Sequence, residues 1–510
     1  MKRTARLIVL LSFSFLFLSA LSLPQQASQQ VSLTILHTND THGHLMPFSY
    51  PSVVPPGSDL AALKVRRNIG GISRRATLVN RLREQLGRKG TTVWLVDAGD
   101  FSDGTPFSTE YHGEADVAAM NATGYTFGTL GNHEFNHPLS RLENLIRMFQ
   151  YPVLCANAIE NSTRAPLTQT AEIRELGPLK IGIFGIVTRS ASAYPAAREG
   201  VTISGEIETA QGMVKALRPN ADIIIAISHC GDEMDWQIAK EVPGVDVIIG
   251  GHSHSRLPLG RDVPHPVDLK SPEVGETTVV QAHQWGGELG RLDLLFSRNA
   301  RGAWYVKDHR ARLISVTPDI PEDKTVAAVV ERYWKPIAAR YGEIIGQAAA
   351  DFVQRGDDLA PYNLMADAIR ETFGTEIELE NLGGVRAPLL KGKITRADLV
   401  DMDPFDNSIV TFEVSGRRLK EILQSESPAV SGLRYRIKNG AVAKVTVGGK
   451  PLGEDRLYTA AANSYFARTA LKDIQVKDTG KPRLDVLIEY IRKKGTVRPV
   501  FDGRRVVTQP

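Results

Sequence analysis

Five short segments of the chain concentrate residue types that bind metal ions or transfer protons. Four of them together hold five of the twelve histidines, and the fifth adds His229. Imidazole, carboxylate and amide oxygen suit Zn, Mn, Fe or a similar divalent ion, and the absence of paired cysteines favours an open, catalytic site over a closed structural one. The segments are Asn39-Asp40-Thr41-His42-Gly43-His44, Asp97-Ala98-Gly99-Asp100, Gly131-Asn132-His133-Glu134, Ser228-His229-Cys230-Gly231 and Gly250-Gly251-His252-Ser253-His254.

Each segment follows a predicted strand. From residue 31 to about 314, short β-rich runs alternate with helical stretches, which is typical of a layered α/β domain. Loops at the carboxyl ends of such strands are where α/β proteins place ligand sites. Two later runs, 277–282 and 289–296, are expected to be antiparallel. The earlier predicted strands are 31–36, 92–96, 125–130, 153–156, 180–187, 222–228 and 245–249.

Each segment alone also has an ordinary structural explanation. Asp97-Ala98-Gly99-Asp100 could be a plain turn, and His229 could be a hydrogen-bonded core histidine. All five in this order, each at a strand end, favour one shared site.

The length of 510 residues indicates roughly three units of about 150 residues. We expect a catalytic domain over residues 31–317, a linker helix over 318–346 that Pro336 interrupts, and a second α/β domain over 347–508. The proline-rich stretch 45–69 is expected to be a surface loop.

The N-terminus reads as a secretory signal peptide over residues 1–26. Three basic residues precede an apolar run at 7–23, and Pro24 follows it. We therefore expect export, to the periplasm or outside the cell, and no stable membrane insertion after cleavage. The alternative is an uncleaved N-terminal anchor, because the run approaches the ~20 residues that span a bilayer.

Charge and cysteine content exclude two classes of protein. Lys plus Arg exceed Asp plus Glu by 61 − 57 = 4, and three of those bases belong to the leader. Bulk charge therefore gives no support for binding a nucleic-acid polymer. Two cysteines, Cys155 and Cys230, exclude a disulfide-stapled scaffold, and we expect both to be buried free thiols.

These segments resemble the binuclear, calcineurin-like metallophosphoesterase superfamily, and within it the secreted 5'-nucleotidase family. The runs Ile35-Leu36-His37-Thr38-Asn39-Asp40-Thr41-His42-Gly43 and Leu130-Gly131-Asn132-His133-Glu134-Phe135 carry the resemblance. It implies an α/β fold, with an N-terminal β-sandwich flanked by helices, a linker helix and a C-terminal substrate domain. It also implies two divalent ions, such as Zn or Mn, and a small phosphoester substrate of the nucleotide class.

The resemblance assigns roles residue by residue. His133 would stay off the metals, beside the leaving group or the phosphoryl oxygens, and Asp97 would be a support residue. Seven residues would be metal ligands: Asp40, His42 and His254 for one ion, Asn132, His229 and His252 for the other, and Asp100 as the bridge between them.

One departure from the family pattern lies beside the catalytic histidine. Family members of the 5'-nucleotidase type have Asp three residues after it, whereas this chain has Asn136. An amide can orient the ring of His133 but cannot stabilise its charged form as a carboxylate does. Asn at this position is similar to the cyclic-nucleotide phosphodiesterase and 3'-nucleotidase branch, whereas Thr41-His42-Gly43-His44-Leu45 is closer to the 5'-nucleotidase branch.

The resemblance also identifies a substrate pocket in the second domain. Asn381 and Arg386 belong to an Asn-Leu-Gly-Gly-Val-Arg loop, and a guanidinium suits phosphate. Phe405 and Tyr465 would stack on a base, which tolerates base identity. Two departures weaken the nucleotide assignment: a Gly-Gly-Asp-Gly-aromatic element is replaced by residues 468–473, and the helix near 360 opens without the basic residue that some members use.

The sequence thus predicts an exported two-metal phosphoester hydrolase of the 5'-nucleotidase type. The alternatives within the family are a 2',3'-cyclic-nucleotide phosphodiesterase/3'-nucleotidase and a UDP-sugar hydrolase. A thiosulfohydrolase branch is disfavoured because Asn132-His133-Glu134 keeps the phosphatase form. A non-catalytic binding protein would require a lost ligand, and all seven ligands are present.

Overall fold

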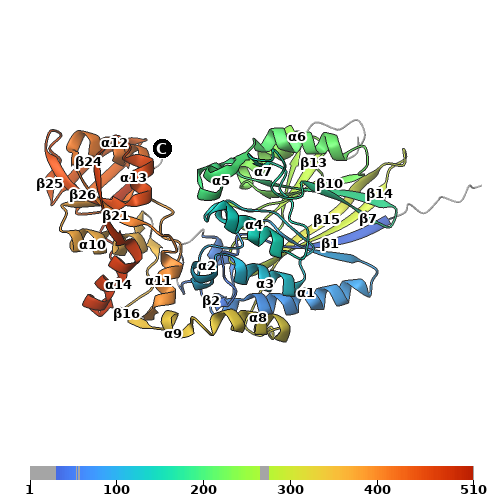
Figure 1. Ribbon diagram of the computed structural model, residues 1–510, viewed down its shortest axis with the longest axis horizontal. Coiled ribbons are helices and arrows are strands. Elements are labelled where there is room, and N and C mark those ends of the chain that lie inside the picture. The colour runs from blue at the N-terminus through green and yellow to red at the C-terminus, as the bar shows by residue number, and fades with distance from the viewer. Residues whose placement is uncertain (1–29, 53, 55–57, 265–274, 356, 509–510) are drawn as a thin grey trace, which may run out of the picture.

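The computed structural model describes residues 30–508, except residues 53, 55–57, 265–274 and 356. Two lobes are joined along one edge by helices α8 (Lys324–Trp334) and α9 (Ala338–Tyr341), with Pro336 in the break between them (Figure 1). The predicted signal peptide lies outside the described residues. Among the described residues, no helix is long and apolar enough to cross a membrane.

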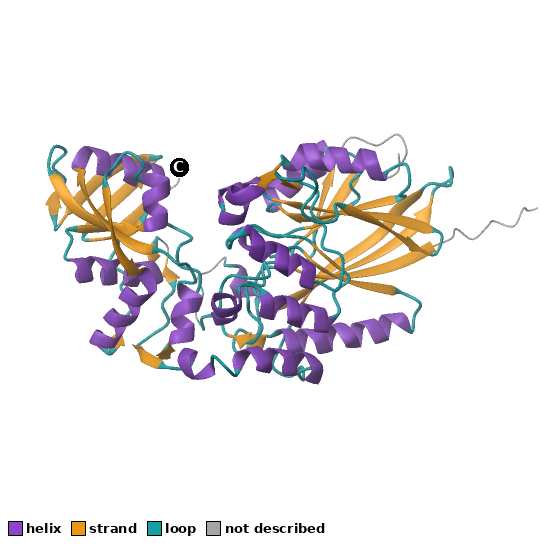
Figure 2. Ribbon diagram, viewed as in Figure 1, coloured by secondary structure: helices purple, strands orange, loops and turns teal. Residues whose placement is uncertain are grey.

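The first lobe contains two sheets that pack face to face (Figure 2). In strand order, the first sheet is β15 (Trp304–Ser315), β14 (Glu288–Arg298), β1 (Gln30–Thr38), β4 (Thr92–Asp97) and β5 (Phe127–Gly128). The second is β12 (Arg261–Pro264), β13 (Glu276–Val280), β11 (Val247–Ile249), β10 (Ile223–His229), β8 (Leu179–Val187) and β7 (Ala171–Leu176).

The central strands of this lobe are buried on both faces. All seven residues of β10 are buried, as expected for parallel strands covered on both sides. Leu33 and Ile183 belong to the core between the two sheets. Helices α1 (Ile72–Gly87) and α3 (Glu114–Thr123) pack with α8 on the outer face of the first sheet, and α6 (Glu206–Leu217) and α7 (Asp232–Glu241) cover the second. The predicted sandwich flanked by helices is confirmed.

Shorter elements of the first lobe surround the strand ends. They are β2 (Pro47–Phe48), β3 (Ile69–Gly70), α2 (Pro106–Tyr111), α4 (Leu139–Met148), β6 (Ala158–Glu160), α5 (Pro195–Gly200), β9 (Val201–Ile203) and the 3-10 turns Asp59–Ala62, His133–Phe135 and Arg189–Ala193.

Three expectations about this lobe were wrong or held only in part. The run 277–282 overlaps β13, which is antiparallel to the edge strand β12, as expected, but parallel to its other neighbour, β11. The run 153–156 forms no strand, because the backbone N–H groups of Leu154, Cys155 and Ala156 bond to three different segments, at Gly128, Gln169 and Gly185. No continuous ladder can form from such pairings.

The third expectation, a surface loop over residues 45–69, holds only in part. Tyr50, Leu63 and Ile69 are buried and pack with Trp285. The Tyr50 and Trp285 rings stack with centroids 5.4 Å apart. These aromatic and aliphatic side chains therefore anchor the stretch to the lobe, while most of its other described residues stay partly or fully exposed.

In its described residues, the second lobe contains four sheets, one of them only a two-stranded pair, and five helices. The main sheet is β22 (Ala429–Ser431), β19 (Ile377–Glu380), β26 (Leu457–Asn463), β21 (Ser408–Ser415) and β27 (Val476–Pro482). A second sheet is formed, in strand order, by β25 (Lys450–Pro451), β24 (Ala441–Val447), β23 (Leu433–Lys438) and β29 (Arg505–Thr508). A third is formed by β20 (Gly392–Thr395), β16 (Ile344–Ala348) and β28 (Thr496–Val497). The two-stranded pair is β17 (Gln354–Arg355) with β18 (Asp358–Leu359). The helices are α10 (Ala360–Phe373), α11 (Arg396–Met402), α12 (Gly416–Glu426), α13 (Ser464–Ala470) and α14 (Arg483–Lys494).

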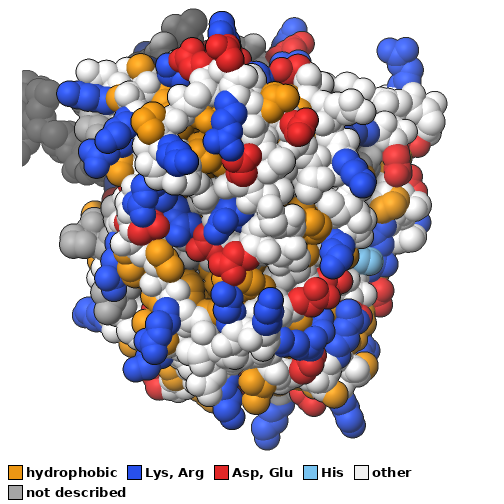
Figure 3. All heavy atoms as spheres, turned by 90° about the vertical axis from the view of Figure 1, so that its left-hand side faces the viewer, with side chains coloured by type: hydrophobic (Ala, Val, Ile, Leu, Met, Phe, Trp, Pro, Cys, Tyr) orange, Lys and Arg blue, Asp and Glu red, His pale blue; other side chains and the backbone are white. Residues whose placement is uncertain are grey.

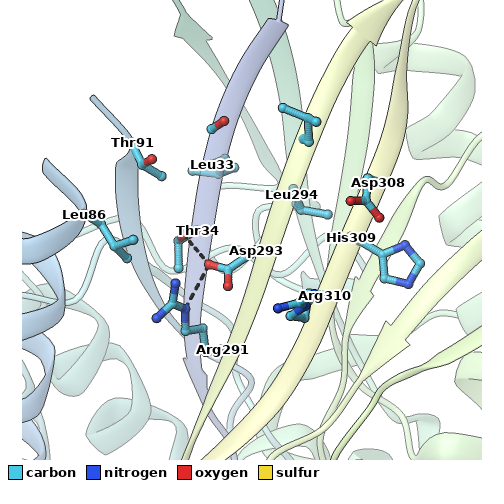
Figure 4. Close-up of a pocket in the computed structure, with 12 residues that line it drawn as sticks. Leu33, Thr34, Leu86, Thr91, Arg291, Asp293, Leu294, Asp308, His309 and Arg310 are labelled. Atoms are coloured by element: carbon cyan, nitrogen blue, oxygen red, sulfur yellow. Dashed lines mark hydrogen bonds and ion pairs between the residues drawn. The ribbon is translucent and has the colours of Figure 1, made fainter. Parts of the chain in front are cut away.

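A hollow of about 300 Å³ lies over strands β1, β14 and β15 (Figure 4). Three of the polar side chains that line it are hydrogen-bonded to one another. The Asp293 carboxylate accepts hydrogen bonds from Thr34 Oγ1 at 2.6 Å and from Arg291 Nε at 2.9 Å. The hollow lies upstream of the strand end at which the Asp40 segment begins, and we assign it no role in the site.

Candidate active site

The five chemical segments meet at the carboxyl ends of their strands. β1 ends two residues before Asp40, β4 three before Asp100, and β11 three before His252, while His229 is the last residue of β10. The predicted convergence of strand ends thus brings these side chains together. Five of the seven predicted ligands have a left-handed backbone; their φ angles are 50° at Asp40, 45° at His42, 50° at Asp100, 77° at His252 and 56° at His254.

Left-handed backbone at non-glycine residues is costly and concentrates at functional sites. Here it turns the chain sharply after each strand, so that the side chains face one another. Close packing of the loops supports the turns. A Cβ atom on Gly131 would lie 2.2 Å from Asp100 Oδ1, so the 131 loop can approach Asp100 only with glycine at this position.

Six of the seven predicted ligands, all but Asn132, form three overlapping groups together with His133. Within each group the potential ligand atoms lie within 4.8 Å of one another. Asp100 Oδ2 lies 3.1 Å from His229 Nε2, and His254 Nε2 lies 3.3 Å from Asp40 Oδ1. Asp100 is shared by two groups, as a bridging ligand would be. The groups are Asp40, His42 and His254; His42, Asp100 and His133; and Asp100, His229 and His252.

An unsatisfied buried oxygen indicates that this donor set fits metal ions. Among the described residues, Asn132 Oδ1 is buried without a hydrogen-bond partner. Such atoms are costly unless an ion or water satisfies them. Nδ1 of His229 lies 2.7 Å from the Ala98 carbonyl, and Nδ1 of His42 lies 2.8 Å from the Asp103 carbonyl. These backbone contacts turn each Nε2 toward the cluster, as second-shell carbonyls do for metal-binding histidines.

The charges of the cluster are strongly coupled. Burial opposes ionisation of Asp100, but His229 and His133 outweigh it and hold the pKa of Asp100 well below its usual range. Burial alone would lower the pKa of His229, but Asp100 and then Asp40 raise it to about 10. Without metal the site therefore holds a carboxylate against an imidazolium. Metal ions must displace that proton, because only neutral imidazole coordinates.

Buried carboxyl groups hold the ligand loops from behind. Glu134 accepts hydrogen bonds from the backbone N–H groups of Gly131, Asp100 and Ser102 at 2.7, 3.0 and 3.2 Å. It therefore ties the 131 loop to the Asp100 loop. Asp97 accepts from Thr38 Oγ1 at 2.6 Å and from the Gly99 N–H at 3.0 Å, and burial raises its pKa to about 7. Neither carboxyl group belongs to the three ligand groups.

A carboxylate that sequence reasoning missed lies beside His133. Asp103 Oδ2 is 3.7 Å from His133 Nδ1, and Asp103 Oδ1 is 3.4 Å from His137 Nε2. Nδ2 of Asn136 lies 2.8 Å from His133 Nδ1 and also donates a hydrogen bond to the Asp103 carboxylate. Burial opposes the charge on Asp103, but the two histidines hold its pKa well below its usual range. The negative charge that Asn136 lacks is therefore supplied by the loop after β4.

We expect Asp103→Asn to lower kcat about 10- to 100-fold, because His133 loses the carboxylate beside its Nδ1. Steady-state kinetics on metal-loaded protein measures the change. The double variant Asp103→Asn, Asn136→Asp returns a carboxylate to the same ring nitrogen and should recover most of kcat. A double variant as slow as Asp103→Asn would show that Asp103 acts otherwise. His137→Gln, which alters the other partner of Asp103, is the matched control.

The second lobe presents two of its four predicted substrate residues to the cluster. Arg386 Nη2 lies 3.3 Å from His42 Nε2, and the Phe405 ring lies 6.3 Å from the His133 ring. Tyr465 is on α13 and is 48% exposed. Asn381 is used inside its own lobe, where its Oδ1 accepts a hydrogen bond from Asn463 Nδ2 at 2.8 Å.

A buried arginine ties the substrate-facing segments of this lobe together. Arg483 is fully buried and donates to Glu380 at 2.6 Å, to the Gly384 carbonyl at 2.7 Å and to both oxygens of Asp403. Gly384 is in the Arg386 loop, and Asp403 is two residues before Phe405. Glu380 also accepts from Asn463, which precedes Tyr465 by two residues. One guanidinium thus fixes the relative positions of the three segments.

We expect Arg483→Lys to raise KM for a nucleotide about tenfold or more, because a single ammonium group cannot make the several hydrogen bonds of the planar guanidinium. Hydrolysis of p-nitrophenyl phosphate, which has no base to bind, should change little. Steady-state kinetics on both substrates is the measurement. Arg418→Lys, at an ion pair with Asp473 on the surface of the same lobe, is the control. Equal losses on the two esters would contradict a role in substrate positioning.

The two cysteines take no part in this site. Cys155 and Cys230 are both buried and free, as expected. Burial raises the pKa of the Cys155 thiol to about 12. It therefore stays protonated near neutral pH and is a poor metal ligand.

Comparison with known proteins agrees with this arrangement. Residues 33–256 match the calcineurin-like phosphoesterase family, and residues 344–472 match the 5'-nucleotidase C-terminal domain. The chain is 26% identical to a 5'-nucleotidase of Vibrio vulnificus, covering 92% of each chain, and 29% identical to the mouse 5'-nucleotidase, covering 96% of this chain and 93% of that one. A crystal structure of a 5'-nucleotidase precursor from Thermus thermophilus is 27% identical and matches with a TM-score of 0.82 over 94% of this chain and 100% of that one.

Proposed function

The chain belongs to the 5'-nucleotidase family of the calcineurin-like metallophosphoesterases, and from that premise we propose that it is an exported 5'-nucleotidase-type hydrolase. It would convert a nucleoside monophosphate and water to a nucleoside and phosphate. The observation that carries the proposal is the convergence of six of the seven predicted ligands on one cluster with a shared carboxylate, Asp100.

The family uses two divalent metal ions, and the donors here fit them. When bound, two such ions lower the pKa of a shared water and hold the phosphoryl oxygens for in-line attack. One ion would be held by Asp40, His42 and His254, the other by Asn132, His229 and His252, with Asp100 between them.

The other groups of the chain act on the ester itself. Arg386 is placed beside His42, where a guanidinium fork can bind phosphate oxygens. His133, protonated on both ring nitrogens, would give the Nε2 proton to the departing oxygen and become neutral, with the Asp103 carboxylate beside its Nδ1. Phe405 and Tyr465 would stack on the base, and this contact tolerates different bases.

Asn136 favours one alternative substrate class, cyclic and 3'-nucleotides. Asp103 weakens that argument, because it supplies a carboxylate beside the same ring nitrogen. UDP-sugars stay a further candidate, because the family that the sequence resembles includes UDP-sugar hydrolases. A non-catalytic binding role is disfavoured by the complete ligand set.

We propose a small-molecule substrate rather than a nucleic-acid polymer. The outer face of the second lobe carries Lys and Arg interspersed with Asp and Glu (Figure 3). Polymer binding needs a continuous basic track to displace counterions. Anionic substrates would instead be attracted by the two cations and Arg386. The proposal of export rests on the predicted leader at residues 1–26.

Phosphate release from the monophosphates tests the proposal directly, together with chromatography of the products from the cyclic nucleotide and UDP-glucose, whose first cleavage frees no inorganic phosphate. Protein stripped of metal is reconstituted with Mn or Zn and incubated with AMP, 3'-AMP, a 2',3'-cyclic nucleotide or UDP-glucose. We expect metal-dependent turnover with AMP as the preferred substrate, abolished by a chelator. Preference for 3'-AMP or the cyclic nucleotide would select the alternative class. No turnover of any substrate by protein holding two metals would favour the binding role.

A further inference from the structure

A tyrosine that no ligand motif includes reaches the candidate metal centre. Tyr194 lies between the 3-10 turn Arg189–Ala193 and helix α5. Its hydroxyl accepts a hydrogen bond from Asn132 Nδ2 at 3.1 Å, and its ring lies 5.8 Å from the ring of His133. The contact joins residues 62 positions apart, so it depends on the fold of both loops.

The backbone around Tyr194 is fixed by local hydrogen bonds. Thr188 Oγ1 accepts from the Ser190 N–H and begins the turn, and the Tyr194 N–H donates to the Ala191 carbonyl at 3.1 Å. Pro195 then begins α5 with its φ already suited to a helix. The hydroxyl is therefore held at a defined place beside Asn132 rather than carried on a loose loop.

The hydrogen bond to Tyr194 determines how the Asn132 amide is oriented. Only its oxygen can bind a metal ion, because the NH₂ group has no lone pair to offer. Asn132 is 2% exposed, and its Oδ1 is buried with no partner among the described residues. The N–H end is turned to Tyr194, so the oxygen end faces the cluster. Without the hydroxyl, the amide would have a buried N–H unsatisfied and nothing to hold its plane.

We propose that Tyr194 is a positioning residue of the metal centre, which holds the Asn132 amide so that Oδ1 points at the second ion. This rests on the proposed two-metal function. Partners of this kind typically set metal affinity by 10- to 100-fold. Tyr194 acts through Asn132 alone, so its effect must disappear when Asn132 is absent.

The test is Mn²⁺ binding by the whole chain, measured by calorimetry on metal-free protein. Tyr194→Phe should weaken one of the two binding events about 10- to 100-fold and leave the other unchanged. In the Asn132→Ala background, adding Tyr194→Phe should change the remaining affinity by less than about threefold. Tyr111→Phe, which removes a phenol hydrogen bond to the Tyr333 carbonyl near the linker, is the control and should bind both ions normally.

Two results would overturn the inference. One is wild-type affinity for both ions in Tyr194→Phe. The other is an equal loss in the Asn132→Ala background, which would mean that Tyr194 acts on the fold and not through Asn132. Wild-type protein that fails to bind two ions would instead overturn the proposed function, so the two failures are distinguishable.

Discussion

Replacing His133 with alanine is expected to lower kcat by about 100- to 10,000-fold while two metal ions stay bound. The side chain is 7% exposed, and Nε2 lies 4.0 Å from Asp100 Oδ2 at the edge of the cluster. Nδ1 is engaged by Asn136 and Asp103, so Nε2 is the atom free to act on the ester. Single-turnover kinetics and metal analysis of the same samples provide the two readouts.

The experiment also decides whether His133 is a metal ligand or a proton donor. His133 belongs to one of the three possible ligand groups, with His42 and Asp100. If His133→Ala loses one ion per chain, the imidazole is a ligand and its assignment to proton transfer is wrong. His137→Ala, at the other histidine beside Asp103, should keep both ions and most of the activity.

The second large effect is expected at Asp100. Asp100→Asn should reduce the metal content to at most one ion per chain and lower kcat by more than about 1000-fold. Asp100 Oδ2 faces His229 at 3.1 Å and His42 at 3.8 Å, so this carboxylate contacts both halves of the ligand set, and closer to His229 than Asp40 does at 4.0 Å. Elemental analysis and phosphate release measure the two losses.

Asp97→Asn is the matched control for Asp100. Asp97 belongs to the same short segment, and burial already favours its neutral form by raising its pKa to about 7. An amide keeps the size of the side chain and should preserve both ions. Full metal content in Asp100→Asn would contradict the bridging role.

Much of the site was predictable because strand ends converge. Long buried runs such as β8 and β10 have unmistakable hydrophobic patterns, and a parallel sheet brings the loops after its strands to one edge. Asp40, Asp100 and His229 could therefore be grouped before any geometry was known. The family resemblance then separated His133 from the ligands, which spacing alone could not do.

The residues that were missed depend on loop geometry. Asp103 reaches His133 only because the backbone after Asp100 turns back through a second left-handed residue, Asp103 itself with φ 65°. An Asp three positions after a ligand was the only available signal, and it is also common in plain turns. Tyr194 had no signal in the sequence, because its partner lies 62 residues away.

The packing errors have a similar origin. The run 153–156 is apolar and resembles a strand, but it crosses between partners in different segments and forms only isolated bridges. The stretch 45–69 contains loop-forming prolines, yet its residues Tyr50 and Leu63 are buried in one cluster with Trp285, which lies more than 200 positions further along the chain. Pairing partners at such distances are set by tertiary structure, which local patterns do not encode.

The central claim, a two-metal phosphoester site at the meeting point of five strand ends, is tested most directly by anomalous diffraction from crystals loaded with Mn²⁺ or Zn²⁺. The account predicts two anomalous peaks about 3.5–4 Å apart, one beside Asp40 and His254, the other beside Asn132 and His252, with Asp100 between them. A single peak, or two peaks that Asp100 does not bridge, would contradict it.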